Sequence, residues 1–92
     1  MNKPVTRYPL GKVVITATAR DAIAIEAIQM ALARHERGDW GNVSASDFAA
    51  NDHALVTRGR LLSVYEDSLG TTFWIITEGD RSSTTILLPE DY

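Results

Sequence analysis

Two short apolar runs near the C-terminus constrain the fold more than any other part of the chain. Residues 73–77 (FWIIT) and 84–88 (TTILL) are aromatic, β-branched or leucine, and most of these side chains fit a pleated surface better than a helix. Residues 78–83 (EGDRSS) between them are typical of a turn, and Pro89 ends the second run because it cannot donate to a strand ladder. The pattern predicts an antiparallel hairpin, with residues 73–77 apolar on both faces and therefore central in the sheet.

The first part of the chain predicts a strand followed by a helix. Residues 12–17 (KVVITA) form a short β-branched run. Thr18 then occupies an N-cap position, and residues 19–37 carry apolar side chains at helical spacing until Gly38 provides a C-terminal stop. An interruption near residues 23–27 would divide this segment into two short helices, and the sequence leaves both forms open.

The middle of the chain predicts a second helix. Either Ser44 or Ser46 is suited to be its N-cap, with Asp47 in the first turn, and Gly59 is suited to end it. The face expected to be buried carries Phe48, Leu55 and Val56.

Residues 60–66 (RLLSVYE) alternate well enough to predict a further strand, with Leu61, Ser63 and Tyr65 on one face. Residues 67–70 (DSLG) then turn the chain into the hairpin. The predicted fold is a single small α+β domain over residues 1–92, ordered β-α-α-β-β-β. Its C-terminal three-stranded antiparallel meander packs against two helices and pairs with the first strand, and residues 1–11 form an extended, partly ordered arm.

Composition limits the classes of function. The 92 residues contain no cysteine, so neither a disulfide framework nor a thiolate metal site can form. The two histidines, His35 and His53, fall on different predicted helices and are not spaced as metal ligands. No run of residues approaches the ~20 apolar residues that span a bilayer. With a net charge of −3, nucleic acid is not the expected direct partner. We expect a cytoplasmic protein with no metal, no cofactor and no membrane association.

Three segments resemble one family of short bacterial proteins: residues 33–41 (ARHERGDWG), 59–65 (GRLLSVY) and 74–92 (WIITEGDRSSTTILLPEDY). They are similar to the uncharacterised "plasmid-related protein" family of plasmids and integrative elements. Gly79 stands where that family usually has alanine, and the first helix is richer in alanine and isoleucine. The resemblance implies a setting on a mobile genetic element and no known activity.

Charged and hydroxyl side chains around the hairpin turn exceed what a turn needs. In the structural interpretation Asp80 caps the turn through its own backbone, and Arg81 pairs with a nearby carboxylate. In the catalytic interpretation the protein is a small ribonuclease of barnase/RelE-like topology, with a histidine or glutamate base and arginines on the phosphate. The ribonuclease candidates are His35, Arg60, Glu78 and Arg81.

The preferred function is that of a small acidic interaction protein, whose partner is a host or element-encoded protein of host defence or nucleic-acid processing. Acidic side chains would present a negative face to a basic partner, although a large indole such as Trp40 in a glycine-flanked loop usually covers the core. A homodimer through an exposed sheet edge, near Trp40 and Trp74, is a further alternative. The binding candidates are Asp39, Trp40, Asp80, Arg81, Thr84 and Thr85.

Overall fold

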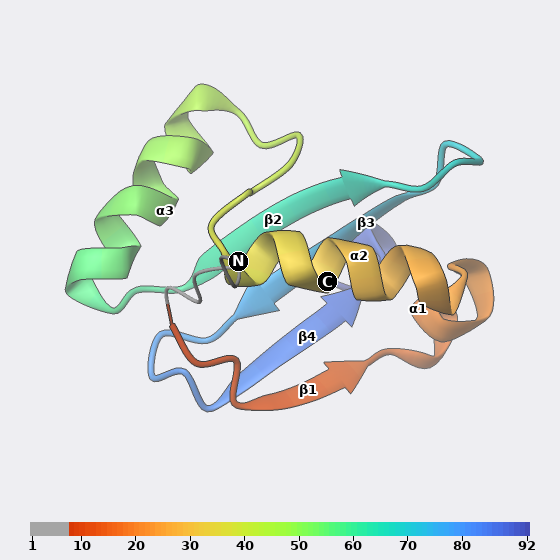
Figure 1. The fold of residues 1–92 in the computed structure, drawn as a ribbon, viewed down its shortest axis with the longest axis horizontal. Coiled ribbons are helices and arrows are strands. Elements are labelled where there is room, and N and C mark those ends of the chain that lie inside the picture. The colour runs from red at the N-terminus through yellow and green to blue at the C-terminus, as the bar shows by residue number, and fades with distance from the viewer. Residues whose placement is uncertain (1–7) are drawn as a thin grey trace, which may run out of the picture.

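A computed structural model describes residues 8–92 and shows one four-stranded sheet with three helices (Figure 1). The strands are β1 (Lys12–Ile15), β2 (Leu61–Glu66), β3 (Thr72–Thr77) and β4 (Ser83–Leu87). The helices are α1 (Ala17–Ala22), α2 (Ile25–Glu36) and α3 (Ala45–Thr57), followed by a C-terminal 3-10 turn, η1 (Pro89–Asp91). This is the predicted α+β class; residues 1–7 of the predicted arm lie outside the described residues.

The sheet has the order β1-β4-β3-β2. The meander is confirmed, because β2 pairs antiparallel with β3 and β3 pairs antiparallel with β4. β3 is therefore an interior strand, as its two apolar faces predicted. The first strand also joins the sheet as expected, and it pairs in parallel with β4, Lys12 opposite Ser83.

The main core lies between the sheet and the first two helices, which cross one of its faces (Figure 1). Ile75 and Ile86 are opposite one another on β3 and β4 and are fully buried, and Ile28 and Ala31 of α2 pack in the same cluster. The alternation of β2 is confirmed, since Leu61, Ser63 and Tyr65 are buried and the residues between them are only half-buried. The opposite face of the sheet is covered in part by η1, where Tyr92 contacts Trp74 edge-on.

α3 packs in a way that corrects the sequence prediction. The expected core residues Phe48 and Val56 are 51% and 83% exposed, and the buried side chains are Asn51 and Ala54. The reason is that α3 lies beside β2, an edge strand whose backbone needs hydrogen-bond partners. The Asn51 amide donates to the carbonyl oxygen of Leu62 (2.7 Å) and accepts from its N–H (3.0 Å).

Two helix boundaries differ from the prediction, and one alternative that the sequence left open is decided. Thr16, not Thr18, is the N-cap of α1, because its hydroxyl accepts from the Ala19 N–H. The first helical segment is interrupted at residues 23–24, which selects the two-helix form. α3 ends at Arg58 in the left-handed region (φ 64°) rather than through Gly59.

The remaining caps are as predicted. Gly38 follows α2 with a positive φ of 83°, and the Ser44 hydroxyl caps α3 by accepting from the Asp47 N–H. Among the helices of residues 8–92, none has the length and apolar character needed to cross a membrane.

Candidate functional site

A chain of hydrogen-bonded side chains runs under the end of α2. His35 has no exposed surface; its Nδ1 bonds the Ser63 hydroxyl, and its Nε2 lies 2.8 Å from the Thr77 hydroxyl. Thr77 and Thr84 hydroxyls are 2.7 Å apart, and Thr84 donates to the Leu10 carbonyl at 2.7 Å. The chain therefore links α2, three strands and the segment before β1.

The terminal carbonyl fixes the direction of every bond in this chain. Because the Leu10 carbonyl only accepts, the single Thr84 proton is committed to it, and the Thr77 hydroxyl must donate to Thr84. Thr77 oxygen then accepts from His35, so the ring carries its proton on Nε2 and its Nδ1 accepts from Ser63. Burial, with the nearby Arg81 charge, lowers the pKa of His35 to about 3, so the ring is neutral at neutral pH.

Arg81 is almost wholly buried and is held by carbonyl oxygens instead of a carboxylate. Its guanidinium donates to Gly59 (2.7 Å), Glu78 (3.2 Å) and Ala54 (3.1 Å), and it lies over the Tyr8 ring. Its backbone adopts the left-handed region (φ 63°) within the β3–β4 turn. Arg81 thus fastens this turn to the C-terminal end of α3.

The ribonuclease candidates divide by exposure into a buried pair and an exposed pair. His35 and Arg81 are both buried beside the Tyr8 ring, whose centroid is 5.7 Å from that of His35 and 5.5 Å from the Arg81 guanidinium. Arg60 and Glu78 form an exposed ion pair (3.4 Å), in which Arg60 also donates to the Tyr92 hydroxyl. A general base must reach the proton that it abstracts, and the enclosed His35 ring has no open path to a substrate.

The binding candidates do not form one exposed surface, because Trp40, Arg81 and Thr84 are buried. Trp40 is buried against Tyr8 and His35, which is the covering role expected of an indole in that loop. Thr84 belongs to the buried chain, and Thr85 points to the other face of the sheet, where it is half-buried. Asp80 is exposed and accepts from the Ser82 N–H, the Asx-type turn predicted for it.

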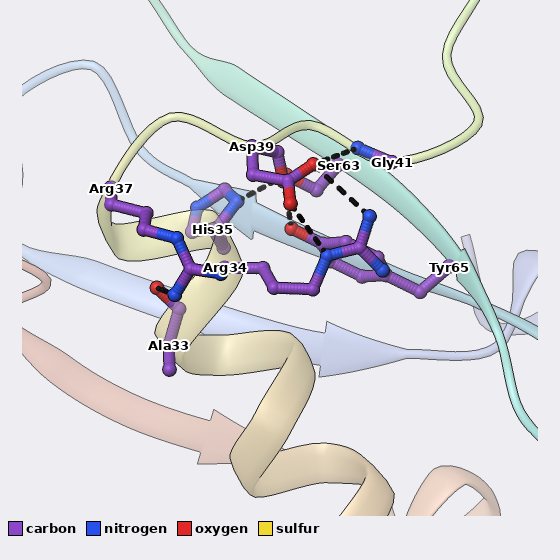
Figure 2. A network of polar contacts seen from close by, with 8 residues as sticks. All are labelled: Ala33, Arg34, His35, Arg37, Asp39, Gly41, Ser63 and Tyr65. Carbon is purple, nitrogen blue, oxygen red and sulfur yellow. Dashed lines mark hydrogen bonds and ion pairs between the residues drawn. The ribbon is translucent and has the colours of Figure 1, made fainter.

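Asp39 takes part in the contacts that join the end of α2 to β2 (Figure 2). Its two oxygens accept from Arg34 Nε (2.8 Å) and a terminal nitrogen (3.0 Å), a bidentate pair that lowers the pKa of Asp39. The Arg34 guanidinium lies 4.8 Å from the centre of the Tyr65 ring, and the Tyr65 hydroxyl donates to the Asp39 carbonyl. Both Arg34 and Tyr65 are thereby fixed in orientation.

Arg34 and Tyr65 also border a groove between α2 and the β2–β3 turn, with a volume of about 380 Å³. Small residues open it: Ala24, Ala27 and Ala31 follow one another at helical spacing along α2 and its N-cap. Apolar groups dominate the exposed wall. The lining residues are apolar (Ala24, Ala27, Met30, Ala31, Tyr65, Phe73) and polar (Glu26, Arg34, Glu66, Asp67, Ser68).

The groove carries an excess of negative charge. Glu26 and Glu66 are exposed and make no hydrogen bond or ion pair with any residue from Tyr8 to Tyr92. Asp67 instead accepts from the backbone N–H groups of the turn, and Arg34, the one lining cation among residues 8–92, is already paired with Asp39. The groove therefore combines apolar walls with two carboxylates free to meet a ligand.

This groove was missed in the sequence, although one signal for it was present. Alanines at positions 24, 27 and 31 indicate a helix face with little side-chain volume, and such a face opposite a strand turn leaves space. Comparisons of the chain with protein-family models, with curated proteins and with solved structures find no match. Function is therefore argued from the groove and its charges.

Proposed function

We propose that the protein is a binding module that recognises a basic segment of another protein in the groove between α2 and the β2–β3 turn. The observation that carries this proposal is the combination of apolar walls with the carboxylates of Glu26 and Glu66, which pair with no residue from Tyr8 to Tyr92. The groove volume of about 380 Å³ falls within the range of ligand pockets, roughly 300–1,000 Å³.

The chemistry of the groove defines its partner. Ala24, Ala27 and Met30 line the groove and keep exposed surface, so they offer apolar contacts for one or two aliphatic side chains. Glu26 and Glu66 line the same groove, so they would attract lysine or arginine residues that flank those aliphatic groups in a ligand. A short segment with leucine or isoleucine between basic residues has this pattern.

Basic segments of this type are common in proteins that bind nucleic acid. If the groove holds such a segment, nucleic acid is excluded from the same segment. The small acidic protein would in this way inhibit a nucleic-acid-processing or host-defence protein. The ribonuclease alternative is weaker, because His35 is enclosed and both of its ring nitrogens are engaged.

The proposal is tested with two fluorescent peptides whose binding is followed by anisotropy. One has two leucines flanked by lysine and arginine, and the other has the same leucines flanked by glutamate. We expect saturable, salt-sensitive binding of the basic peptide alone.

Matched variants locate the binding. Glu66→Lys reverses a groove charge and should weaken the basic peptide about tenfold, whereas Asp52→Lys makes the same charge change on the exposed part of α3 and should have little effect. Ala27→Leu fills the groove and should also weaken binding. Equal losses in Glu66→Lys and Asp52→Lys would show attraction by net charge and would refute a groove site.

A further inference from the structure

The two edges of the sheet differ in how their backbone groups are satisfied. On the β2 edge, Leu62 is bonded by the Asn51 side chain, the Val64 N–H donates to the Trp40 carbonyl, and the Val64 carbonyl accepts from Asn42. The β2 edge lies next to Trp40, where an exposed edge for dimer formation was predicted, and it is covered by the chain itself. An additional strand has no place to pair there.

Among residues 8–92, no segment covers the outer edge of β1 (Figure 1). Lys12 N–H donates to Ser82 and Thr16 N–H donates to Ile86, so the even-numbered residues of this segment turn their backbone groups toward β4. The N–H and C=O groups of Val13 and Ile15 consequently point outward. No residue in the described part of the chain, 8–92, hydrogen-bonds to these four groups.

We propose that two copies of the protein pair through β1, antiparallel to one another, about a twofold axis at Val14. In an antiparallel pair the residues with outward groups exchange both of their hydrogen bonds. Val13 of each copy therefore faces Ile15 of the other, and all four outward groups of each strand are satisfied. Val14 faces its own counterpart on the axis, where two partly exposed apolar side chains (39%) cover each other.

The same register matches charges across the axis. Lys12 of one copy falls opposite Thr16 of the second copy, on the sheet face that η1 partly covers. The Thr16 hydroxyl donates to Asp91 Oδ2 (2.8 Å), so an exposed carboxylate is held beside that position. Each Lys12 ammonium thus meets the Asp91 carboxylate of the other copy, and the symmetry makes this contact twice. An unrelated strand has no reason to carry the complementary charge, and this favours a second copy.

Engineered cysteines provide a test, because the natural chain has none. Residues opposite one another in this way have Cα atoms about 4.5–5.5 Å apart, which suits a disulfide. Val14→Cys should form a covalent dimer under mild oxidation. Val13→Cys should not, because position 13 faces position 15 of the other copy, and Val56→Cys on the exposed side of α3 is a second negative control.

Sedimentation equilibrium of the unmodified chain completes the test. We expect a reversible dimer that Val14→Asp abolishes, and Lys12→Glu should raise the dimer dissociation constant about tenfold. A wild-type chain that stays monomeric at millimolar concentration, or equal cross-linking of all three cysteine variants, would overturn the proposal. Binding of the basic peptide by Val14→Asp should be unchanged, so this result is independent of the groove.

Discussion

Acid should destabilise this fold through His35 well before its carboxylates are protonated. The folded protein keeps the ring neutral, with a pKa lowered to about 3 from an ordinary value of 6.5, and its Nδ1 must stay unprotonated to accept from Ser63. The unfolded chain binds a proton near pH 6.5. Unfolding therefore takes up a proton below that pH, so stability is complete above pH 6.5 and falls as the pH drops toward 3.

The size of the effect follows from the two pKa values. Between pH 7.5 and pH 5 the unfolded ring goes from mostly neutral to almost fully protonated, while the folded ring remains neutral. At about 1.4 kcal/mol per pH unit below 6.5, the free energy of unfolding should fall by roughly 2 kcal/mol. Normal carboxylates, with pKa values of about 4, contribute little in this window.

Urea denaturation at pH 7.5, 6.5 and 5 measures this loss directly. His35→Gln keeps a neutral polar side chain that does not titrate, so this variant, though less stable overall, should lose less than about 0.5 kcal/mol across the same window. His53→Gln, at an exposed position on α3, should keep the wild-type slope. If wild type and His35→Gln show equal slopes, the folded protein does not hold His35 neutral.

Three further changes test other contacts. Asn51→Ala leaves the Leu62 backbone groups without partners and should cost about 1–3 kcal/mol, seen as a melting temperature lower by several degrees. Arg81→Lys cannot keep all three carbonyl bonds and should lower the free energy of unfolding by roughly 2 kcal/mol, seen as a lower urea midpoint. Val56→Ser, at a position 83% exposed, should leave the melting temperature within about 2 °C; a larger fall would mean that α3 buries its predicted face.

The hairpin of β3 and β4 was predictable because its signals are local. A row of β-branched and aromatic residues, a polar turn and Pro89 specify two paired strands without reference to the rest of the chain. The caps Gly38 and Ser44 were predictable for the same reason, since each acts on its own helix end.

The errors arise where distant parts of the chain meet. The inward face of α3 is set by the hydrogen bonds that β2 needs, so Asn51 replaces Phe48 in the buried set. Similarly, His35 and Arg81 are residue types common in catalytic sites. Only the structure shows that both are buried and belong to the core. The groove arises from two segments about forty residues apart in sequence, and the alanine face of α2 alone does not show which segment lies opposite it.

The central claim, recognition of basic segments in the groove, is tested most directly by NMR. The basic leucine peptide would be titrated into ¹⁵N-labelled protein, following the backbone amide shifts. We predict saturating changes confined to Ala27, Met30, Glu66, Ser68 and their neighbours along α2 and the β2–β3 turn, and their absence with the glutamate-flanked peptide. Changes spread over the surface, or centred on α3 or the β1 edge, would contradict the account.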